Sequence, residues 1–354
     1  MIKYLGSKRT LVPIIGALAT AIGARTALDL FTGTTRVAQE LKRRGLAVTA
    51  VDLASYSHVL AQTFIATDAT RVDRDRLADI VVALMALPGT HGYFTETFCV
   101  QSRFFQPKNG MRIDAIRDRI ERDYREHPVY PILLTMLMLA ADRVDSTTGV
   151  QMAYLKDWAP RAYHDLELRI PALLSGGGRA ICGDATTVAA DLGHFDLAYV
   201  DPPYNQHRYF NNYHIWETLI RWDAPEHYGK ACKRIDARDE ATKSPFNSRR
   251  EMPRVFRETL AHIDAEVIAV SYNNEAWVSA QDISEWLIRD GHEQVAVFDF
   301  DFKRYVGAQI GIFNPAGEKV GTVSHTRNVE HIIVAGPRAQ LAKISDALQQ
   351  PCSR

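Results

Sequence analysis

Short apolar runs and helical periodicities alternate at the start of the chain. Residues 26–31 and 47–51 are apolar runs of strand length, and residues 36–44 between them repeat apolar positions with helical spacing. A strand, a helix and a strand in this order predict a βαβ unit with parallel strands and a right-handed crossover. Residues 7–23 predict a preceding helix that tolerates Pro13 near its first turns.

The middle of the chain has a different pattern. From about residue 64 to residue 172 strand signals almost vanish, and helical patterns replace them, notably at residues 112–125 and 131–144. Strand-like runs return at residues 179–182 and 195–200. The sequence therefore predicts an α/β fold in which a doubly wound, mostly parallel sheet is interrupted by a mainly helical insertion.

The C-terminal part adds further strands to this sheet. A polar, aromatic and basic stretch fills residues 205–250. After it, residues 266–271 predict a strand and residues 281–289 a helix. Residues 293–305 have a hairpin-like pattern, and residues 331–334 predict the strand that closes the sheet.

Composition and charge place the chain among globular proteins. It has 354 residues, of which 46% are hydrophobic and 24% are charged. Lys plus Arg equal Asp plus Glu at 42 each, so net charge neither suggests nor excludes a nucleic-acid partner. Residues 101–125 hold seven basic and four acidic side chains, and residues 230–257 hold nine and four. Such a local excess suits a nucleic-acid groove, and it equally suits solvated helix faces.

Cysteine and histidine spacing argues against disulfide and metal chemistry. The four cysteines form no CxxC pair, and the 12 histidines show neither HxxxH nor HExxH spacing. These features favour a reducing compartment and no metal site. No apolar run reaches membrane-spanning length, and the N-terminus does not resemble a signal peptide. We therefore expect a soluble, cytoplasmic protein without a membrane partner.

The tetrapeptide Asp201-Pro202-Pro203-Tyr204 is the strongest candidate for chemistry. It follows the apolar run at residues 195–200, at the carboxyl end of a predicted strand, where ligands bind in α/β sheets. The two prolines fix φ twice and remove two backbone donors. A carboxylate, a preset carbonyl and an aromatic ring are then presented together. An ordinary proline-rich turn is the alternative.

Three further aspartates end or follow predicted strands. Asp29 precedes a turn in which Gly33 lets the backbone approach a ligand, just before a helix start with free N–H groups. Asp52 ends the next strand and can accept both hydroxyls of a ribose, and Asp184 follows the strand at residues 179–182. Each aspartate alone could be a helix cap. If the strands are adjacent and parallel, the carboxylates line one edge of the sheet.

These motifs and their order resemble the Dam-type family of S-adenosylmethionine-dependent DNA adenine-N6 methyltransferases. Residues 3–8 are similar to the family's N-terminal motif of an aromatic residue, a glycine and a lysine. Residues 29–33 resemble its D-x-F-x-G-x-G motif, and residues 201–204 its D-P-P-Y motif. Thr35 replaces the second glycine of the family, and this β-branched residue could narrow the cofactor pocket or alter the turn.

The resemblance implies both an architecture and a cofactor site. Residues 1–65 and 175–354 would form a Rossmann-like, seven-stranded methyltransferase sheet, and residues 66–174 a helical insertion for target recognition. S-adenosylmethionine would contact Tyr4, Lys8, Asp29, Gly33, Asp52, Asp184 and Asp201. In this assignment Lys8 holds the methionine carboxylate of the cofactor and Asp29 its amino group. Asp52 would hold the ribose, and Asp184 would lie near the adenine ring.

The resemblance also implies a catalytic set of Asp201, Pro202 and Tyr204. The exocyclic amine of adenine is a poor nucleophile because its lone pair is delocalised into the ring. Hydrogen bonds from the amine to the Asp201 carboxylate and the Pro202 carbonyl would favour a pyramidal nitrogen aimed at the sulfonium methyl group. Tyr204 would stack on the base after the base leaves the duplex stack.

Basic and aromatic side chains in three segments are candidate contacts to DNA. Those after the tetrapeptide suit stacking and phosphate contacts, although their aromatic rings could equally pack in the core. Those at residues 244–250 form a basic loop or a solvated connector, and those of the insertion are candidates for sequence recognition. The candidates are Arg103, Lys108, Arg208, Tyr209, Arg249 and Arg250.

The sequence favours a site-specific enzyme acting on adenine in double-stranded DNA. Methylation of adenine in RNA, N4-methylation of cytosine, and a catalytically silent nucleic-acid-binding protein are the alternatives. The recognised sequence, a cognate restriction endonuclease and the oligomeric state do not follow from one chain.

Overall fold

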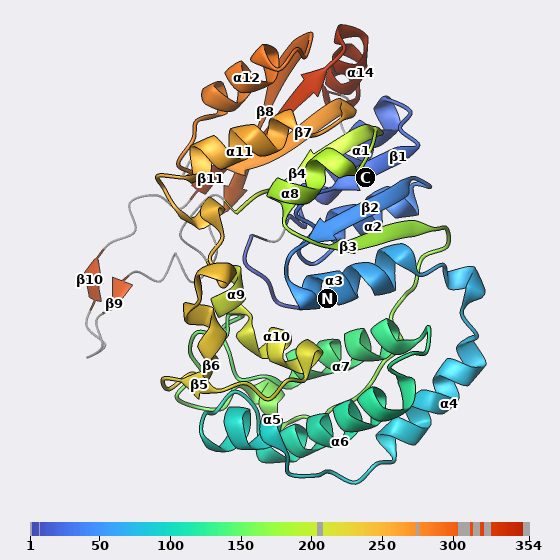
Figure 1. Cartoon of the computed structure of the whole chain (residues 1–354), viewed down its shortest axis with the longest axis vertical. Helices are drawn as coiled ribbons and strands as arrows, with labels where there is room; N and C mark the ends of the chain where they lie inside the picture. The colour runs from blue at the N-terminus through green and yellow to red at the C-terminus, as the bar shows by residue number, and fades with distance from the viewer. Residues whose placement is uncertain are drawn as a thin grey trace.

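A seven-stranded sheet forms the centre of the computed structural model, which describes residues 2–6, 8–203, 208–273, 276–303, 312–313, 319–321 and 327–349. The strand order is β3-β2-β1-β4-β7-β11-β8 (Figure 1). The strands are β1 (Thr26–Asp29), β2 (Ala47–Asp52), β3 (Gly178–Cys182), β4 (Phe195–Val200), β7 (Ala265–Asn273), β8 (Gln294–Lys303) and β11 (Arg327–Gly336). The strands from β3 to β7 are parallel, and β11 runs antiparallel to β7 and β8. The predicted doubly wound, mostly parallel sheet is confirmed.

The last two strands of the sheet differ from the sequence-based expectation. The described part of residues 293–305 is the single strand β8, and its antiparallel partner is β11. β11 lies between β7 and β8, so β8 forms the edge and residues 331–334 do not close the sheet. Burial gives the reason, because Ile332 and Ile333 enter the cores on opposite faces of the sheet. A run that is apolar on both faces belongs inside a sheet, whereas the alternating pattern of β8 suits an edge.

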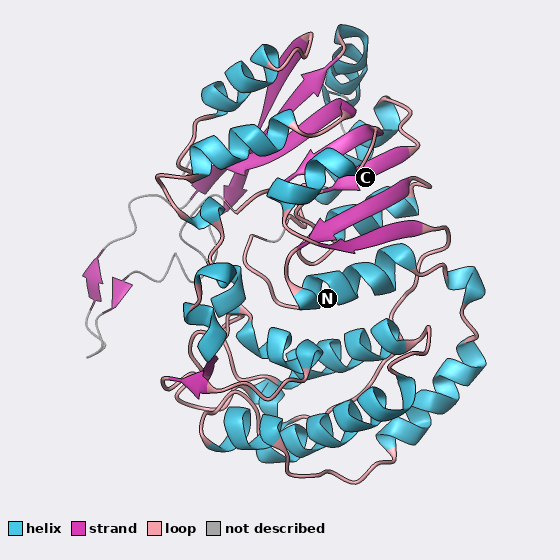
Figure 2. Cartoon of the chain, viewed as in Figure 1, coloured by secondary structure: helices cyan, strands magenta, loops and turns pink. Residues whose placement is uncertain are grey.

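Helices cover both faces of the sheet (Figure 2). On one face α1 (Val12–Ala21), α2 (Arg36–Arg43) and α14 (Arg338–Gln349) share a core with Ile332. On the other face α8 (Ala185–Val188), α11 (Met252–Ala261) and α12 (Ala280–Arg289) share a second core with Ile333. α3 (Ser55–Ala61) follows β2 and packs against β3. This arrangement leaves the carboxyl ends of β1, β2 and β4 to the loops.

The segment at residues 66–174 consists of helices joined by loops, and it contains no strand. Its helices are α4 (Arg74–Met85), α5 (Tyr93–Thr95), α6 (Pro107–Tyr124) and α7 (Tyr130–Val144). α7 is buried along most of its length and packs against α3 and against α10 (His214–Arg221). Its side chains belong to the same hydrophobic core as α1 and α2. The helical segment is therefore packed onto the sheet domain rather than separated from it.

Shorter elements connect these parts. They are α9 (Tyr209–Asn212), the hairpin of β5 (His227–Tyr228) with β6 (Lys233–Arg234), and the pair β9 (Ile312–Phe313) with β10 (Lys319–Gly321). Single turns of π-helix or 3₁₀-helix lie at Gln62–Ala66, Ala69–Arg71, Glu96–Val100, Pro160–Tyr163, Ala189–Asp191, Ile235–Arg238, Glu240–Thr242 and Pro245–Asn247. Among the helices that the structure describes, none is long and apolar enough to cross a membrane.

A buried arginine joins the helical segment to the rest of the chain. Arg117 of α6 has a fully buried side chain, and its guanidinium donates to the carbonyl oxygens of Leu219 at 2.8 Å and Ile220 at 2.9 Å. These carbonyls lie at the C-terminal end of α10, where intrahelical donors run out. Arg117 also pairs with Glu121 at 2.7 Å. The guanidinium thus caps α10 from a helix that is remote in sequence.

Candidate active site

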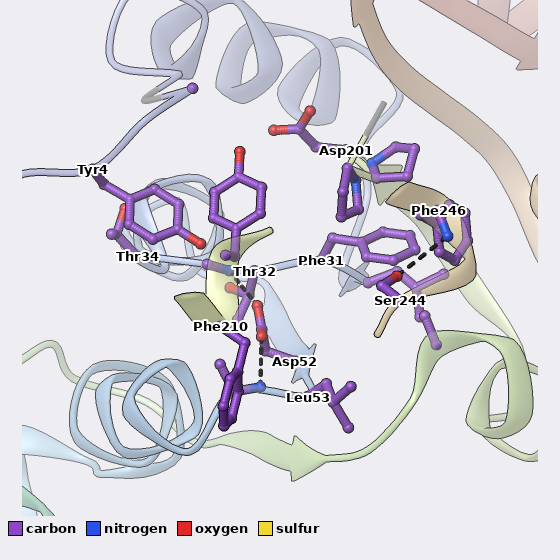
Figure 3. Close-up of a pocket in the computed structure, with 18 of the residues that line it drawn as sticks. Tyr4, Phe31, Thr32, Thr34, Asp52, Leu53, Asp201, Phe210, Ser244 and Phe246 are labelled. Atoms are coloured by element: carbon purple, nitrogen blue, oxygen red, sulfur yellow. Dashed lines mark hydrogen bonds between the residues drawn. The ribbon is translucent and has the colours of Figure 1, made fainter. Parts of the chain in front are cut away.

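Four aspartates meet at the carboxyl edge of the sheet. Asp29, Asp52, Asp184 and Asp201 all line one pocket, because β3, β2, β1 and β4 are adjacent and parallel. This is the arrangement expected from the sequence if the strands were neighbours. Figure 3 shows Asp52 and Asp201 in this pocket together with Tyr4, Phe31 and Phe246.

The segment before α1 closes one side of the pocket. The helix begins at Val12 and not at residue 7, and the Lys8 carbonyl accepts from the backbone N–H groups of Leu11 and Val12. Lys8 therefore lies before the helix, where it lines the pocket, and its side chain is 9% exposed. Ser7 lies outside the described residues.

Tyr4 is fixed in this segment by aromatic stacking. Its ring stacks on Tyr213 with centroids 4.7 Å apart and on Tyr209 with centroids 5.2 Å apart. The backbone N–H of Leu5 donates to the Tyr213 hydroxyl at 2.7 Å. The backbone N–H of Lys3 donates to Asp142 of α7 at 3.1 Å. The N-terminal segment is thus attached both to the chain after the tetrapeptide and to the helical segment.

The turn after β1 has the backbone that a close ligand needs. Gly33 has φ +50°, and a Cβ at this position would lie 3.2 Å from the Tyr4 ring. Its N–H donates to Asp52 Oδ2 at 2.8 Å. Thr35 is fully buried at φ 61°, and its hydroxyl accepts from Gln39 at 2.8 Å. Thr35 is not among the residues that line the pocket, so it occupies the left-handed position of the family's glycine without narrowing the site.

Asp29 is a buried carboxylate with one satisfied oxygen. Its Oδ2 accepts from the Thr32 hydroxyl at 2.8 Å and from the Ala38 N–H at 3.1 Å. Within the described part of the chain, its buried Oδ1 has no hydrogen-bond partner. Burial raises the pKa of Asp29 from 3.8 to about 7, and the nearby Asp201 adds to the rise. An unsatisfied, desolvated acceptor of this kind suits a cationic group.

Asp52 faces the same pocket from the end of β2. Besides the Gly33 N–H, its carboxylate accepts from the Ala54 N–H at 2.9 Å. Burial raises the pKa of Asp52 from 3.8 to about 6, against the lowering effect of these two hydrogen bonds. Glu217 of α10, whose side chain is fully buried, accepts from the Ser55 N–H at 3.1 Å and so binds the start of α3 next to Asp52.

Asp201 follows β4 with its side chain 18% exposed. Its Oδ1 lies 3.3 Å from Lys8 Nζ, which also lies 3.0 Å from Oε2 of Glu330. Burial raises the pKa of Asp201 from 3.8 to about 6, while Lys8 lowers it and Glu330 raises it. Pro202 is buried beside it and lines the pocket. Tyr204 lies outside the described residues.

Aromatic side chains form the apolar wall of the pocket. Phe31 meets Phe246 edge to face with centroids 5.2 Å apart, and the Ser244 hydroxyl accepts from the Phe246 N–H at 3.3 Å. Phe210 lies under the Arg221 guanidinium at 5.6 Å. Sequence reasoning did not assign these rings to the site. The sequence could have indicated them, because Phe31 lies in the motif at residues 29–33, and Phe210 and Phe246 lie in the aromatic and basic segments that follow the tetrapeptide.

Asp184 combines a structural contact with its place in the pocket. Its Oδ1 accepts from the Thr186 N–H at 2.9 Å and from the Thr186 hydroxyl at 2.8 Å, so it caps α8. The helix-cap alternative and the position at the sheet edge both hold for this residue.

The six candidate DNA contacts are not gathered in one place. Arg208 and Tyr209 line the pocket, and Arg249 and Arg250 are exposed in the turn before α11. The other two anchor the loop that follows α7. Arg103 donates to the Lys156 carbonyl at 2.9 Å and lies over Trp158, and Lys108 pairs with Asp165 at 2.5 Å. The structure does not bring Arg103 and Lys108 to the pocket.

The residues that the structure describes contain no group of three His, Cys, Asp or Glu side chains that could hold a metal ion. The pocket is lined by carboxylates, Lys8, the arginines Arg36, Arg208 and Arg221, aromatic rings and backbone donors.

Comparisons with known proteins give a consistent result. Residues 4–283 match the model of the D12 class N6 adenine-specific DNA methyltransferases. The chain is 30% identical over 304 residues to the type II methyltransferase M.NlaIII of Neisseria lactamica, covering 81% of this chain and 88% of that protein. It is 28% identical to M.CviAII of Paramecium bursaria Chlorella virus 1, over 76% of this chain and 81% of that one. The modification methylase StsI of Streptococcus sanguinis is 28% identical over 80% of this chain, which spans 46% of its length.

Proposed function

The chain belongs to the D12 class N6 adenine-specific DNA methyltransferase family, and we propose that it methylates adenine N6 at a specific site in double-stranded DNA. The family takes its methyl group from S-adenosylmethionine, which supplies an electrophilic sulfonium methyl when bound. The observation that carries the proposal is the carboxylate of Asp201 beside Lys8 in a pocket formed by four strand-end aspartates.

The side chains present fit this cofactor. The unsatisfied Oδ1 of Asp29 suits an ammonium group, and the Lys8 ammonium suits a carboxylate. Asp52, at the end of β2, is placed to accept ribose hydroxyls. The rings of Phe31 and Phe246 offer apolar surface for a base, with Asp184 at the same edge. We propose these residues, with Tyr4 and Gly33, as the cofactor site.

Asp201 and Pro202 act on the amine in this proposal. The carboxylate of Asp201 and the carbonyl of Pro202 accept hydrogen bonds from the two amine N–H groups, which favours a pyramidal nitrogen. Negative charge on Asp201 stabilises the positive charge that develops on the amine. The stacking role of Tyr204 stays a prediction from the sequence.

The proposed DNA-binding surface includes the pocket and the exposed turn before α11. Arg208 and Tyr209 line the pocket that would receive an extruded base, and Arg249 and Arg250 extend positive charge on the exposed turn before α11. We propose the helical segment at residues 66–174 for target recognition. Replacing Arg103 and Lys108 with alanine should then weaken DNA binding and reduce its salt dependence. An unchanged salt slope would remove these two residues from the DNA surface.

The test is transfer of labelled methyl from S-adenosylmethionine to unmethylated genomic DNA, followed by identification of the modified nucleoside by mass. We expect N6-methyladenine, and Asp201→Ala should lower the rate at least a thousandfold while the fold is retained. Asp346→Ala, which removes an exposed carboxylate on α14, is the matched control. N4-methylcytosine, or product on RNA alone, would replace the proposed substrate. A rate for Asp201→Ala above about a tenth of the wild-type rate, a loss of only ~1.4 kcal/mol in the barrier, would exclude Asp201 from the mechanism.

Location in the cell is part of the same proposal. Cys99, Cys182 and Cys232 are free thiols, as suits a DNA-modifying enzyme in a reducing cytoplasm. Cys352 lies outside the described residues.

A further inference from the structure

One lysine is shared between two carboxylates at the candidate active site. Lys8 Nζ lies 3.0 Å from Glu330 Oε2 and 3.3 Å from Asp201 Oδ1. The side chains of all three residues are largely buried, with 9% of Lys8, 14% of Glu330 and 18% of Asp201 exposed. Glu330 is the nearer partner and accepts a hydrogen bond from the lysine.

The sheet topology explains how Glu330 reaches this position. Glu330 lies on β11 directly across from Asn273 at the end of β7. Because β11 is inserted between β7 and β8, it carries a carboxylate toward the edge that holds the four aspartates. Glu330 lies on β11 one residue before His331 and the buried apolar residues 332–335, and it lies outside residues 4–283 that match the family model.

A second carboxylate beside Lys8 is electrostatically unfavourable. Lys8 alone could neutralise Asp201, and a second anion leaves the trio with a net charge of −1. Like charges near one another in a poorly solvated site are unfavourable. The second anion changes how strongly the lysine is engaged by the first, because the ammonium now divides its hydrogen bonds and its field between two acceptors.

We propose that Glu330 is a positioning residue that holds Lys8 partly away from Asp201, so that the Asp201 carboxylate stays available to the amine of the substrate. The inference rests on the proposed roles of Lys8 and Asp201. Without the negative charge of Glu330, Lys8 pairs more strongly with Asp201, and the amine must compete with a tighter ion pair. Glu330 acts through Lys8 and does not touch the reacting atoms.

The charge environment of Asp201 gives a readout that a purely structural role would not change. Among the residues that the structure describes, the charged and titratable groups that face Asp201 are Lys8 from the N-terminal segment, Glu330 from β11, Asp29 from β1 and Tyr199 from β4. Glu330 raises the pKa of Asp201 and Lys8 lowers it. Removing the charge of Glu330 should therefore let Asp201 ionise at lower pH.

The experiment compares wild type, Glu330→Gln and Glu330→Asp, with Asp299→Asn as the matched control. Asp299 is an exposed carboxylate on β8 that pairs with His331, so its loss removes a charge from the same sheet without affecting Lys8. Two quantities are measured, the single-turnover methylation rate at saturating cofactor and DNA, and the titration of Asp201 by carboxyl ¹³C NMR in the free protein. The Asp201 signal is assigned from its loss in Asp201→Asn.

We expect Glu330→Gln to slow methyl transfer at least tenfold and to shift the Asp201 titration to lower pH. Glu330→Asp should recover at least half of the lost rate on a logarithmic scale, and Asp299→Asn should match wild type. In a Lys8→Met background, Glu330→Gln should cause no further loss. A rate for Glu330→Gln within twofold of wild type, or a slower rate with an unmoved titration, overturns the inference. Activity of Asp201→Ala would instead overturn the proposed function, so the two failures are separable.

Discussion

The backbone N–H of Gly33 donates to Asp52 Oδ2 at 2.8 Å, and this bond joins the turn after β1 to the end of β2. The turn approaches Tyr4 closely, so that a Cβ at Gly33 would make an unusually tight contact of 3.2 Å with the Tyr4 ring. Contacts within the protein therefore hold the turn after β1, the end of β2 and the segment with Tyr4 together at the proposed cofactor site.

Gly33→Ala should weaken cofactor binding at least tenfold. The new Cβ would lie 3.2 Å from the Tyr4 ring at φ +50°, so it adds both a contact and backbone strain. Titration calorimetry with S-adenosylmethionine measures the effect. Gly45→Ala is the control, because Gly45 has φ +90° with nothing within 4 Å of its Cβ position. Both variants should lose about 1 kcal/mol of stability, and equal cofactor affinity in the two would contradict the role of Gly33.

Thr35→Gly should leave cofactor affinity within twofold of wild type. Thr35 does not line the pocket, although it occupies a left-handed conformation that costs a β-branched residue about 1 kcal/mol. Glycine would remove this backbone strain, but the loss of the buried threonine side chain offsets the gain. We therefore expect the free energy of unfolding to change by less than about 1 kcal/mol. A clear gain or loss of cofactor affinity would show that Thr35 shapes the pocket after all.

Asp29→Asn should stabilise the free protein at pH 8 and weaken its affinity for the cofactor. Burial raises the Asp29 pKa from 3.8 to about 7, which corresponds to a cost on the order of 4 kcal/mol for the ionised form. The asparagine oxygen can still accept from Thr32 and Ala38. Thermal unfolding and calorimetry report the two effects, and a less stable variant with unchanged affinity would count against Asp29 as the partner of an ammonium group.

Methyl transfer should slow as pH falls through about 6. In the proposed mechanism the negative charge of the Asp201 carboxylate acts on the amine, and burial raises the pKa of Asp201 to about 6, so protonation removes this charge below that pH. Single-turnover rates at saturating DNA and cofactor, from pH 5 to pH 8, measure this acid limb. Because Asp29, Asp52 and Asp201 have raised pKa values, their protonation favours the folded state at low pH, and that contribution is lost as pH rises through about 6 to 7. Unfolding driven by these groups therefore cannot imitate the acid limb, and a rate that stays constant down to pH 5 would refute the assignment.

Arg117→Met should destabilise the protein by about 2–4 kcal/mol. The change leaves the carbonyls of Leu219 and Ile220 without a buried donor and deprives Glu121 of one partner. Urea unfolding measures the loss. Arg125→Met is the control, because Arg125 pairs with the same Glu121 at 2.7 Å but its side chain is 69% exposed, so it should cost less than about 0.5 kcal/mol. Equal losses would show that the contacts to α10 contribute little.

The sequence was most informative where chemistry and local structure coincide. Asp29, Asp52 and Asp201 each directly end or follow an apolar strand, so their common edge follows from the parallel order of those strands. Pairing between distant segments carries no such local signal. The insertion of β11 between β7 and β8, and with it the approach of Glu330 to Lys8, depends on which strand is buried on both faces.

The site also depends on contacts between segments that are distant in sequence, which short motifs do not predict. Tyr4 was expected at the cofactor, but its stacking on Tyr213 joins two segments that lie far apart in the chain. Lys8 was expected to lie at the start of a helix, and it lies before one, because the first helical residue is Val12. In both cases tertiary packing decided a position that local periodicity left open.

The common hydrophobic core of α7 with α3 and α10 has a consequence for engineering. The segment proposed for target recognition also holds the start of the chain through Lys3, so it cannot be exchanged as an independent module. Grafting residues 66–174 from a relative with another specificity would require its side chains facing α3, α10 and Lys3 to be transplanted as a set. Inherited changes of specificity in such a scaffold should accordingly arise by substitution on its outer surface more readily than by wholesale replacement.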